Sequence, residues 1–100
     1  MRIVLILLLT GAAAWAADAK AGQAVYTRAC RSCHGAEGVP SAAVAKMLKA
    51  EMRDLKVALS KLSDADIRKI IVEGKDKMVA TKGVSGADVD NVIAHVRTLK

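Results

Sequence analysis

The chain has 100 residues and a formal net charge of +6, with 53% hydrophobic but only 2% aromatic residues. A chain of this length makes one small domain. The positive charge alone would suit a nucleic-acid-binding protein, but the chain has no block of basic residues and too few aromatic side chains to stack bases, so we expect no nucleic-acid partner.

The first 16 residues have the pattern of a secretory signal peptide. Arg2 precedes the unbroken apolar run Ile3–Leu9, and Ala14–Ala16 provides small residues in an A-x-A arrangement. The apolar segment is shorter than the ~20 residues that a membrane-spanning helix needs, which disfavours the alternative of a retained membrane anchor. We therefore predict cleavage after residue 16, a single mature domain over 17–100, and export to the periplasm.

The mature part begins with a predicted helix over Lys20–Cys33, on which four residues share one face: Gly22, Val25, Tyr26 and Ala29. The segment His34–Pro40 follows as a loop, because it contains two glycines and the only proline of the chain. Ser41 is a suitable cap for a second helix that extends to about Arg53. One side of this helix is apolar and carries Val44, Met47 and Leu48. The segment Asp54–Lys61 shows no clear pattern.

The next predicted helix has a signal at each end. Ser63 with Asp66 three residues later is typical of a helix start, and Gly74 is typical of a helix stop. Between them lies an apolar stripe of Ile67, Ile70 and Ile71. The following segment, Lys75–Val84, is predicted to be a loop around Met78.

Ser85 and Asp88 are predicted to open the last helix, since they have the spacing of a capping box. Along this helix five apolar residues recur at helical spacing: Val89, Val92, Ile93, Val96 and Leu99. The chain shows no alternating strand pattern, no internal repeat and no linker. We therefore predict a single all-α domain.

The segment Cys30–His34 reads Cys-Arg-Ser-Cys-His, and C-x-x-C-H is the attachment signature of c-type haem. The two thiols lie one helical turn apart, so each can add across one vinyl group of the haem. His34 is then placed under the iron and can offer an imidazole nitrogen as the proximal ligand. Because Cys30 and Cys33 are the only cysteines, no other thiol competes for the porphyrin.

Other roles for the cysteine pair fit the sequence less well. A redox dithiol of the thioredoxin type follows a strand, whereas a helix is predicted before Cys30. A zinc site would need a second pair of ligands, but outside the motif the only histidine is His95 and there is no further cysteine. A disulfide across two intervening residues would close too small a loop to stabilise the domain much.

Three parts of the sequence carry a resemblance: the motif at the end of the first helix, the Gly-x-x-x-Met loop Gly74–Met78 and the closing helix Asp88–Lys100. Together they resemble the small monohaem class I cytochromes c, in particular the short bacterial periplasmic type. The resemblance covers essentially the whole mature chain. It implies a small class I cytochrome c fold, with about four helices wrapped around one covalently attached haem.

The resemblance also implies the residues that hold this haem c. Cys30 and Cys33 would form the thioether bonds, and His34 and Met78 would be the axial ligands of the iron. The carbonyl of Pro40 would accept a hydrogen bond from the ring N–H of His34. Where relatives often have Met-Pro, this chain has Met-Val at positions 78 and 79, which suggests a more mobile ligand loop.

Three other residues are rival candidates for the sixth iron ligand. Met47 and Met52 fall within the second predicted helix, where packing explains Met47 better. His95 would give bis-histidine ligation, but the family usually places there an aromatic residue that packs on the first helix near Gly22. We therefore expect a structural role for His95.

With both axial positions filled, the iron would not readily bind a substrate, so we predict a soluble, monomeric one-electron carrier and not an enzyme. It would shuttle electrons between periplasmic or membrane redox enzymes and meet membranes only through such partners. Lysine and arginine side chains around the haem edge would favour partners with acidic surfaces. The candidates for this basic rim are Arg31, Lys46, Lys49, Lys75, Lys77 and Lys82.

Two alternative functions remain open. In the first, the chain is a haem-bearing subunit permanently docked to a larger oxidoreductase. In the second, Met78 is not a ligand, and an open iron site serves a sensor or a peroxidase. In every case the scarcity of aromatic residues predicts that the haem completes the core and that the chain without haem is largely unfolded.

Overall fold

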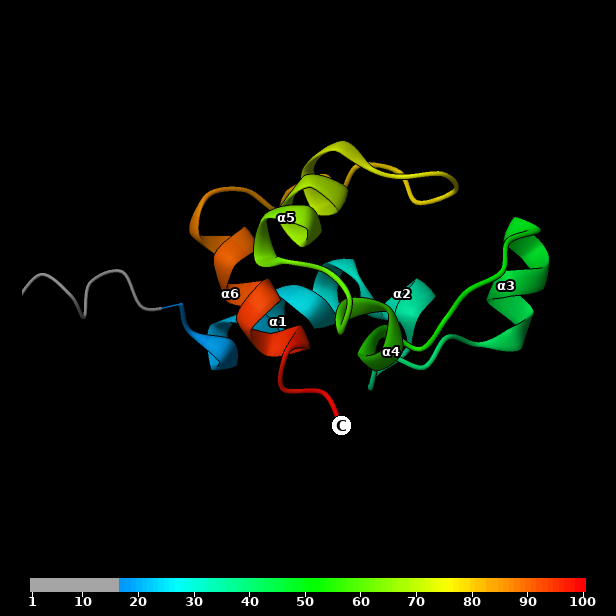
Figure 1. Cartoon of the computed structure of the whole chain (residues 1–100), viewed down its shortest axis with the longest axis horizontal. Coiled ribbons are helices and arrows are strands. Elements are labelled where there is room, and N and C mark those ends of the chain that lie inside the picture. Colours follow the sequence, from blue (N-terminus) through cyan, green and yellow to red (C-terminus); the bar gives the residue numbers. More distant parts are fainter. Residues whose placement is uncertain (1–16) are drawn as a thin grey trace, which may run out of the picture.

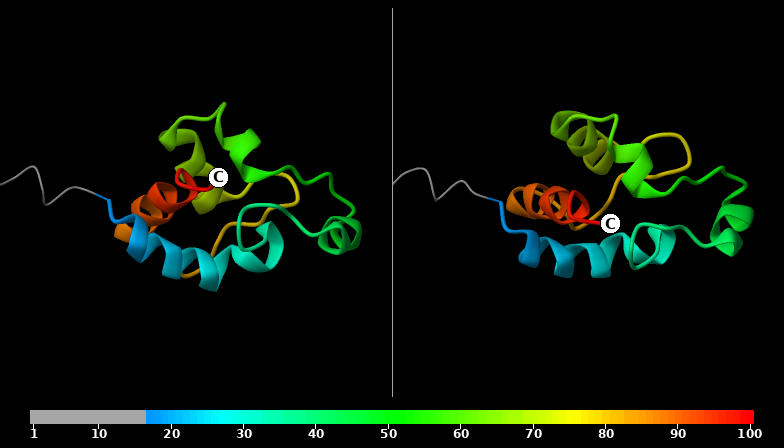
Figure 2. Two further views of the ribbon diagram at one scale, coloured as in Figure 1. Left: turned by 90° about the horizontal axis from the view of Figure 1, so that it is seen from below. Right: turned by 60° about the horizontal axis from the view of Figure 1, so that its bottom comes forward.

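The computed structural model describes residues 17–100, so the predicted signal peptide lies outside the described residues. The described part forms six helices and no named strand. The helices are α1 (Ala19–Ala29), α2 (Arg31–His34), α3 (Ala42–Leu48), α4 (Leu55–Leu59), α5 (Asp64–Glu73) and α6 (Ala87–Val96), as Figure 1 shows. Figure 2 shows α6 running alongside α1, with α5 on the other side of α6. The all-α class is therefore confirmed, with six helices where about four were predicted.

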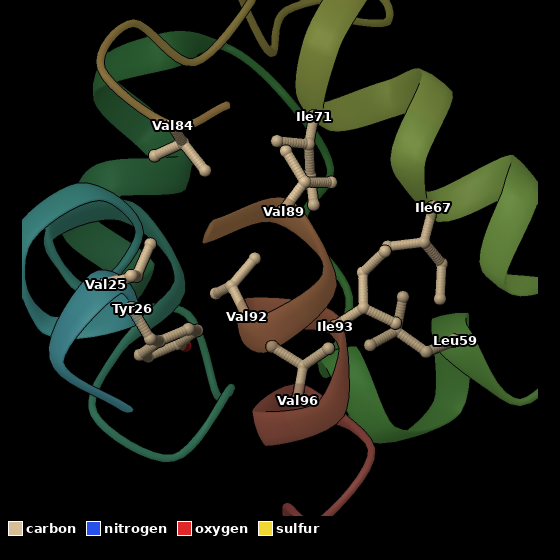
Figure 3. Packing of buried hydrophobic residues seen from close by; sticks show 10 residues of the cluster. All are labelled: Val25, Tyr26, Leu59, Ile67, Ile71, Val84, Val89, Val92, Ile93 and Val96. Atoms are coloured by element: carbon tan, nitrogen blue, oxygen red, sulfur yellow. The ribbon is translucent and has the colours of Figure 1, made fainter. Parts of the chain in front are cut away.

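The hydrophobic core lies where α6 packs between α1 and α5 (Figure 3). Its most buried side chains on α6, Val89 and Val92, are each only 1% exposed. The buried cluster consists of Val25, Tyr26, Leu59, Ile67, Ile71, Val84, Val89, Val92, Ile93 and Val96. The apolar faces predicted for the first and last helices are thus confirmed, and Leu99 packs against the cluster although it lies beyond α6. Of the stripe predicted on α5, Ile67 and Ile71 belong to the cluster and Ile70 does not.

Helices α1 and α6 approach each other closely at Gly22. A Cβ atom added there would lie 1.8 Å from the backbone oxygen of Asn91, so no side chain fits at this position. Nearby, the N–H of Asp18 donates to the side-chain oxygen of Asn91 at 2.8 Å. The Asp18 carboxylate accepts from two N–H groups in the first turn of α1, which caps that helix. The start of α1 is therefore both capped and joined to α6.

The predicted helix over Lys20–Cys33 is divided at Cys30, whose φ of −121° and ψ of −30° depart from helical values. Helix α2 begins directly after this break. The Tyr26 hydroxyl donates to the backbone carbonyl of Gly35 at 2.6 Å, which holds the end of α2 against α1. The break therefore turns the motif while keeping it attached to the core.

The second predicted helix ends earlier than expected. Ser41 caps α3 as predicted, since its hydroxyl oxygen accepts from two N–H groups of the first turn. Lys49 then adopts a left-handed conformation with φ of 54° and ends the helix, so Met52 lies outside it. No residue of α3 is buried, and Met47 is 74% exposed. The prediction that Met47 is explained by packing is wrong, because most of its side chain is exposed, whereas Val44 and Leu48 on the same side are partly buried.

The two ends of α5 are as predicted, but the start of α6 is not. Ser63 and Asp66 form a capping box in which each side chain accepts from the other residue's N–H at 3.1 Å, and Gly74 ends the helix. At α6 the cap is Gly86, which has φ of 56° and makes no side-chain hydrogen bond. Ser85 contributes only its carbonyl, so the predicted capping box at its side chain is wrong.

Candidate haem-binding site

The two cysteines lie on consecutive parts of the chain where α1 gives way to α2. Both thiols are free, with Cys30 partly buried and Cys33 exposed. The N–H groups of Cys33 and His34 donate to the carbonyl of Cys30 at 3.3 and 3.0 Å, which places the two cysteines one turn apart. Burial raises the pKa of the Cys30 thiol, and the charge of Arg28 opposes this rise. The turn thus presents two thiols that are not joined to each other.

His34 ends α2 and is partly buried. Its Nδ1 atom is buried and has no hydrogen-bond partner among the described residues. Burial lowers the pKa of the imidazole, so the ring is neutral at neutral pH and keeps a lone pair for a metal. A buried nitrogen without a partner is costly unless something else satisfies it.

The Nδ1 atom of His34 has no partner among the described residues and so does not donate to the carbonyl of Pro40. The predicted hydrogen bond from this ring nitrogen to Pro40 is therefore wrong. The loop after the motif instead closes on Gly35, which has φ of 80°. A Cβ atom at Gly35 would lie 2.1 Å from the backbone oxygen of Val39. The backbone of Val39 therefore lies against Gly35, directly after the motif.

Met78 is partly buried in the loop between α5 and α6. Lys75 and Met78 form an isolated antiparallel bridge, in which each N–H donates to the other's carbonyl, at 2.8 and 2.9 Å. Gly74 has φ of 83°, and a Cβ atom there would lie 2.7 Å from the carbonyl oxygen of Met78. Only glycine suits this turn, so Gly74 and the bridge fix the backbone that carries the Met78 thioether.

The structure brings the motif and the Met78 loop to the same end of the described molecule. In Figures 1 and 2, α2, α3 and the yellow loop that carries Met78 all lie away from the start of α1. Cys30, Cys33 and His34 come from α1 and α2, and Met78 comes from the distant loop. Met47 lies on α3 at this same end and, unlike the partly buried Met78, is exposed.

His95 lies on α6, at the interface with α1. Its ring centroid is 5.2 Å from that of Tyr26, with an angle of 56° between the rings. Tyr26 is 2% exposed, and its burial raises the pKa of the hydroxyl to about 12. Contact with a core tyrosine supports the structural role that we predicted for His95, although the closest approach of the two helices, at Gly22, is made by Asn91.

The six residues predicted to form a basic rim are all exposed. They lie on α2, on or next to α3, and in the loop between α5 and α6, which is the end of the molecule that carries the motif (Figure 2). By contrast, three of the acidic residues that form ion pairs lie on α5 and α6: Asp64, Asp88 and Asp90. Each of these three carboxylates is paired with an arginine, whereas the six rim residues form none of the ion pairs within the described part of the chain.

Sequence reasoning missed two side chains that support the site. The Tyr26 hydroxyl holds the carbonyl of Gly35, next to His34. Arg28, two residues before Cys30, donates to the carbonyl of Gly83 in the Met78 loop at 3.2 Å. A tyrosine and an arginine near a helix end are common, so only the contacts in three dimensions reveal these roles.

Among residues 17–100, no helix is long and apolar enough to cross a membrane. No three His, Cys, Asp or Glu side chains gather in that part of the chain to hold a metal ion. The donor set that does occur is two thiols one turn apart followed by a neutral histidine with a buried, unpartnered nitrogen. These residues fit a covalently attached haem, because the thiols can form thioether bonds and the imidazole can bind iron.

Comparisons with known proteins agree with this fit. The family described as cytochrome c oxidase, cbb3-type, subunit III matches residues 17–96. Cytochrome c-554(547) of Halothiobacillus neapolitanus is 29% identical over 91 residues, which cover 85% of this chain and 100% of that protein. Among solved structures, the KustC0563 c-type cytochrome has a TM-score of 0.63 and 29% identity, over 79% of this chain and 96% of that chain. The likeness confirms the predicted small cytochrome c fold.

Proposed function

Since the chain belongs to the cytochrome c family and carries covalently bound haem c, we propose that it transfers single electrons through an iron held by His34 and Met78. Haem c supplies an iron that changes its charge by one unit between its two oxidation states. The observation that carries the proposal is the neutral, partly buried His34, whose Nδ1 lacks a partner and which directly follows two unbonded thiols.

The other residues of the site have separate roles in this proposal. Cys30 and Cys33 form the two thioether bonds, and the one-turn spacing places both bonds on one side of the motif. Met78 provides a soft thioether donor, and a thioether ligand favours ferrous iron. Gly74 holds the Met78 backbone in its tight turn, which limits the movement of the donor between the two oxidation states.

We propose that the chain carries electrons without catalysing a reaction of its own. If His34 and Met78 both hold the iron, no coordination position would be left for a substrate. The export signal predicted over residues 1–16 would place this carrier in the periplasm. As a soluble monomer it would move between its redox partners by diffusion.

The partners that we propose have acidic surfaces at the point of contact. The exposed basic residues of the motif end would steer such partners at low salt, and the attraction would fall as salt screens it. Lys77→Glu should therefore slow electron transfer to an acidic partner at low salt, whereas Lys61→Glu, away from the Met78 loop, should slow it less. Equal rates for the two variants would contradict a docking surface at this end.

A second candidate is a haem-bearing subunit that stays docked on an oxidase, because the matching family is described as an oxidase subunit. In support of the free carrier, the chain matches cytochrome c-554(547) over all of that protein, which is named as a cytochrome and not as a subunit. Size-exclusion chromatography of periplasmic extract separates the two functions. A free carrier elutes as a small coloured protein, and a docked subunit elutes with its larger complex.

The ligand assignment is tested by Met78→Ala, with Met47→Ala as the matched control. The parent protein, when oxidised, should show a far-red charge-transfer band from the thioether sulfur to the iron, and when reduced it should bind carbon monoxide poorly. Met78→Ala should lose the band and bind carbon monoxide readily, while Met47→Ala should keep the parent behaviour. Loss of the band in Met47→Ala instead would assign the ligand to α3. Ready carbon monoxide binding by the parent would favour an open-site sensor or peroxidase.

A further inference from the structure

Arg28 lies in the last turn of α1 and joins three parts of the chain. Its Nη1 donates to the carbonyl of Gly83 at 3.2 Å, and its Nη2 lies 3.6 Å from the carboxylate of Asp88 at the start of α6. Two residues later the chain reaches Cys30. We propose that Arg28 is a positioning residue that ties the Met78 loop to the haem-attaching helix and so keeps Met78 on the iron. This inference rests on the proposed His34 and Met78 ligation.

The bond from Arg28 is well placed to restrain the loop. Within residues 17–100 it is the one side-chain hydrogen bond that joins α1 to the segment between α5 and α6. Gly83 has φ of 78°, and a Cβ atom there would lie 3.6 Å from Nη1 of Arg28, so the guanidinium lies close to the glycine backbone. On the other side of the loop, the N–H of Thr81 donates to the carbonyl of Ile71 at 2.9 Å. The segment after Met78 is therefore held from α5 and from α1.

The Arg28 tether matters more in this chain than it would in one with Met-Pro at positions 78 and 79, because residue 79 here is valine. Val79 is 80% exposed and makes no contribution to the buried core, so it does not hold the loop. Movement of Met78 away from the iron would pull on the segment that Arg28 holds at Gly83, so this bond would oppose it. A competing ligand binds only the open form, so its apparent affinity rises in proportion to the open fraction. Removing the tether should raise that fraction.

The expected size of the effect follows from the kind of bond. A hydrogen bond from a charged donor contributes more than a neutral one, but the Arg28 side chain is 53% exposed, which weakens the contribution. We expect Arg28→Gln to tighten apparent binding of a competing ligand about fivefold to tenfold. The ion pair with Asp88 is a surface pair, so Asp88→Asn should change this binding by less than about twofold. The influence of Arg28 on the Cys30 pKa plays no part, because a thioether sulfur does not titrate.

The test uses the oxidised holoprotein and imidazole as the competing ligand. Imidazole is titrated while the far-red charge-transfer band is followed, and thermal unfolding is measured in parallel. Arg53→Gln is the matched control, since Arg53 is exposed and forms no ion pair or side-chain hydrogen bond within the described residues. It makes the same change of charge without touching the loop. Arg28→Lys keeps the charge and one donor, so it should recover part of the parent behaviour.

The proposal holds if Arg28→Gln binds imidazole about fivefold to tenfold more tightly, while Arg53→Gln and Asp88→Asn stay within about twofold of the parent. It is overturned if Arg28→Gln matches the parent, or if Arg53→Gln or Asp88→Asn shows the same shift. A parent protein without the charge-transfer band would instead overturn the Met78 ligation on which the inference rests. The two failures are therefore distinguishable in one set of spectra.

Discussion

Substitution of Gly22 by alanine tests whether the contact between α1 and α6 organises the domain. Helix propensity alone predicts that Gly22→Ala stabilises the protein by about 1 kcal/mol, because glycine is unfavourable inside a helix. The structure predicts the opposite sign. The added Cβ atom would lie 1.8 Å from the backbone oxygen of Asn91 and 2.4 Å from its carbonyl carbon, and backbone atoms of a packed helix cannot turn aside.

The magnitude follows from the distance that the helices must move. An ordinary carbon–oxygen contact is about 3.3 Å or more, so the two backbones must separate locally by roughly 1.5 Å. A gap of that size forfeits a large part of the dispersion contacts between Val25 and Tyr26 on α1 and Val89 and Val92 on α6. We expect a cost of about 3–5 kcal/mol, and a net loss of about 2–4 kcal/mol after the gain in propensity.

The measurement is thermal unfolding of the holoprotein, followed by far-UV circular dichroism and by the haem absorbance. For a domain of this size, the net loss corresponds to a fall in Tm of roughly 10–30 °C. Ala24→Gly on the exposed side of α1 is the control, because it calibrates the propensity term alone at about 1 kcal/mol. A Gly22→Ala protein at least as stable as the parent would refute the view that this crossing requires glycine.

Three further outcomes are expected. Tyr26→Phe removes the hydroxyl that donates to Gly35, so the guanidinium midpoint should fall by an amount equivalent to about 1–2 kcal/mol, and an unchanged midpoint would contradict a role for this bond. The hydrogen bonds with Ser63 hold the pKa of Asp66 below its usual range, so the stabilisation is present above about pH 4 and is lost as the pH falls through the lowered pKa. The difference in Tm between the parent and Asp66→Asn should therefore be seen at pH 7 and vanish in strong acid; a difference that persists there would count against it. Removal of the haem should leave a chain with largely unfolded far-UV circular dichroism, and a native-like helical spectrum would show that the polypeptide core suffices.

The sequence predicted best those features that depend on a few neighbouring residues. Ser63, Asp66 and Gly74 mark both ends of α5 as expected, because caps are local hydrogen-bonded structures. The valines of α6 are buried as expected, since their spacing places them on one face of a long helix. The C-x-x-C-H motif predicted haem c for the same reason, as its chemistry is contained in five consecutive residues.

The features that the sequence did not predict depend on contacts between distant segments. The break at Cys30 is accompanied by the bond from Tyr26 to Gly35, which no helix propensity describes. Arg97 donates to the carbonyls of Leu59 and Leu62, both at 2.7 Å, and so joins the end of α6 to α4 and the turn before α5. Such bonds are formed only after the helices have packed, so their partners cannot be read from local sequence.

Helix α3 shows how a cofactor limits what hydrophobic periodicity can predict. The spacing of apolar residues tells that one side of a helix avoids water, but not whether protein or another group covers it. Within residues 17–100, Met47 on α3 and Val79 beside Met78 are the two most exposed of the large hydrophobic side chains, at 74% and 80%. Both belong to segments at the end that carries His34 (Figure 2). These two exposed side chains thus lie at the end where the haem is attached, although Val57 and Val72 are also exposed, on α4 and α5. Since the chain has only two aromatic residues, we expect the macrocycle to complete its core.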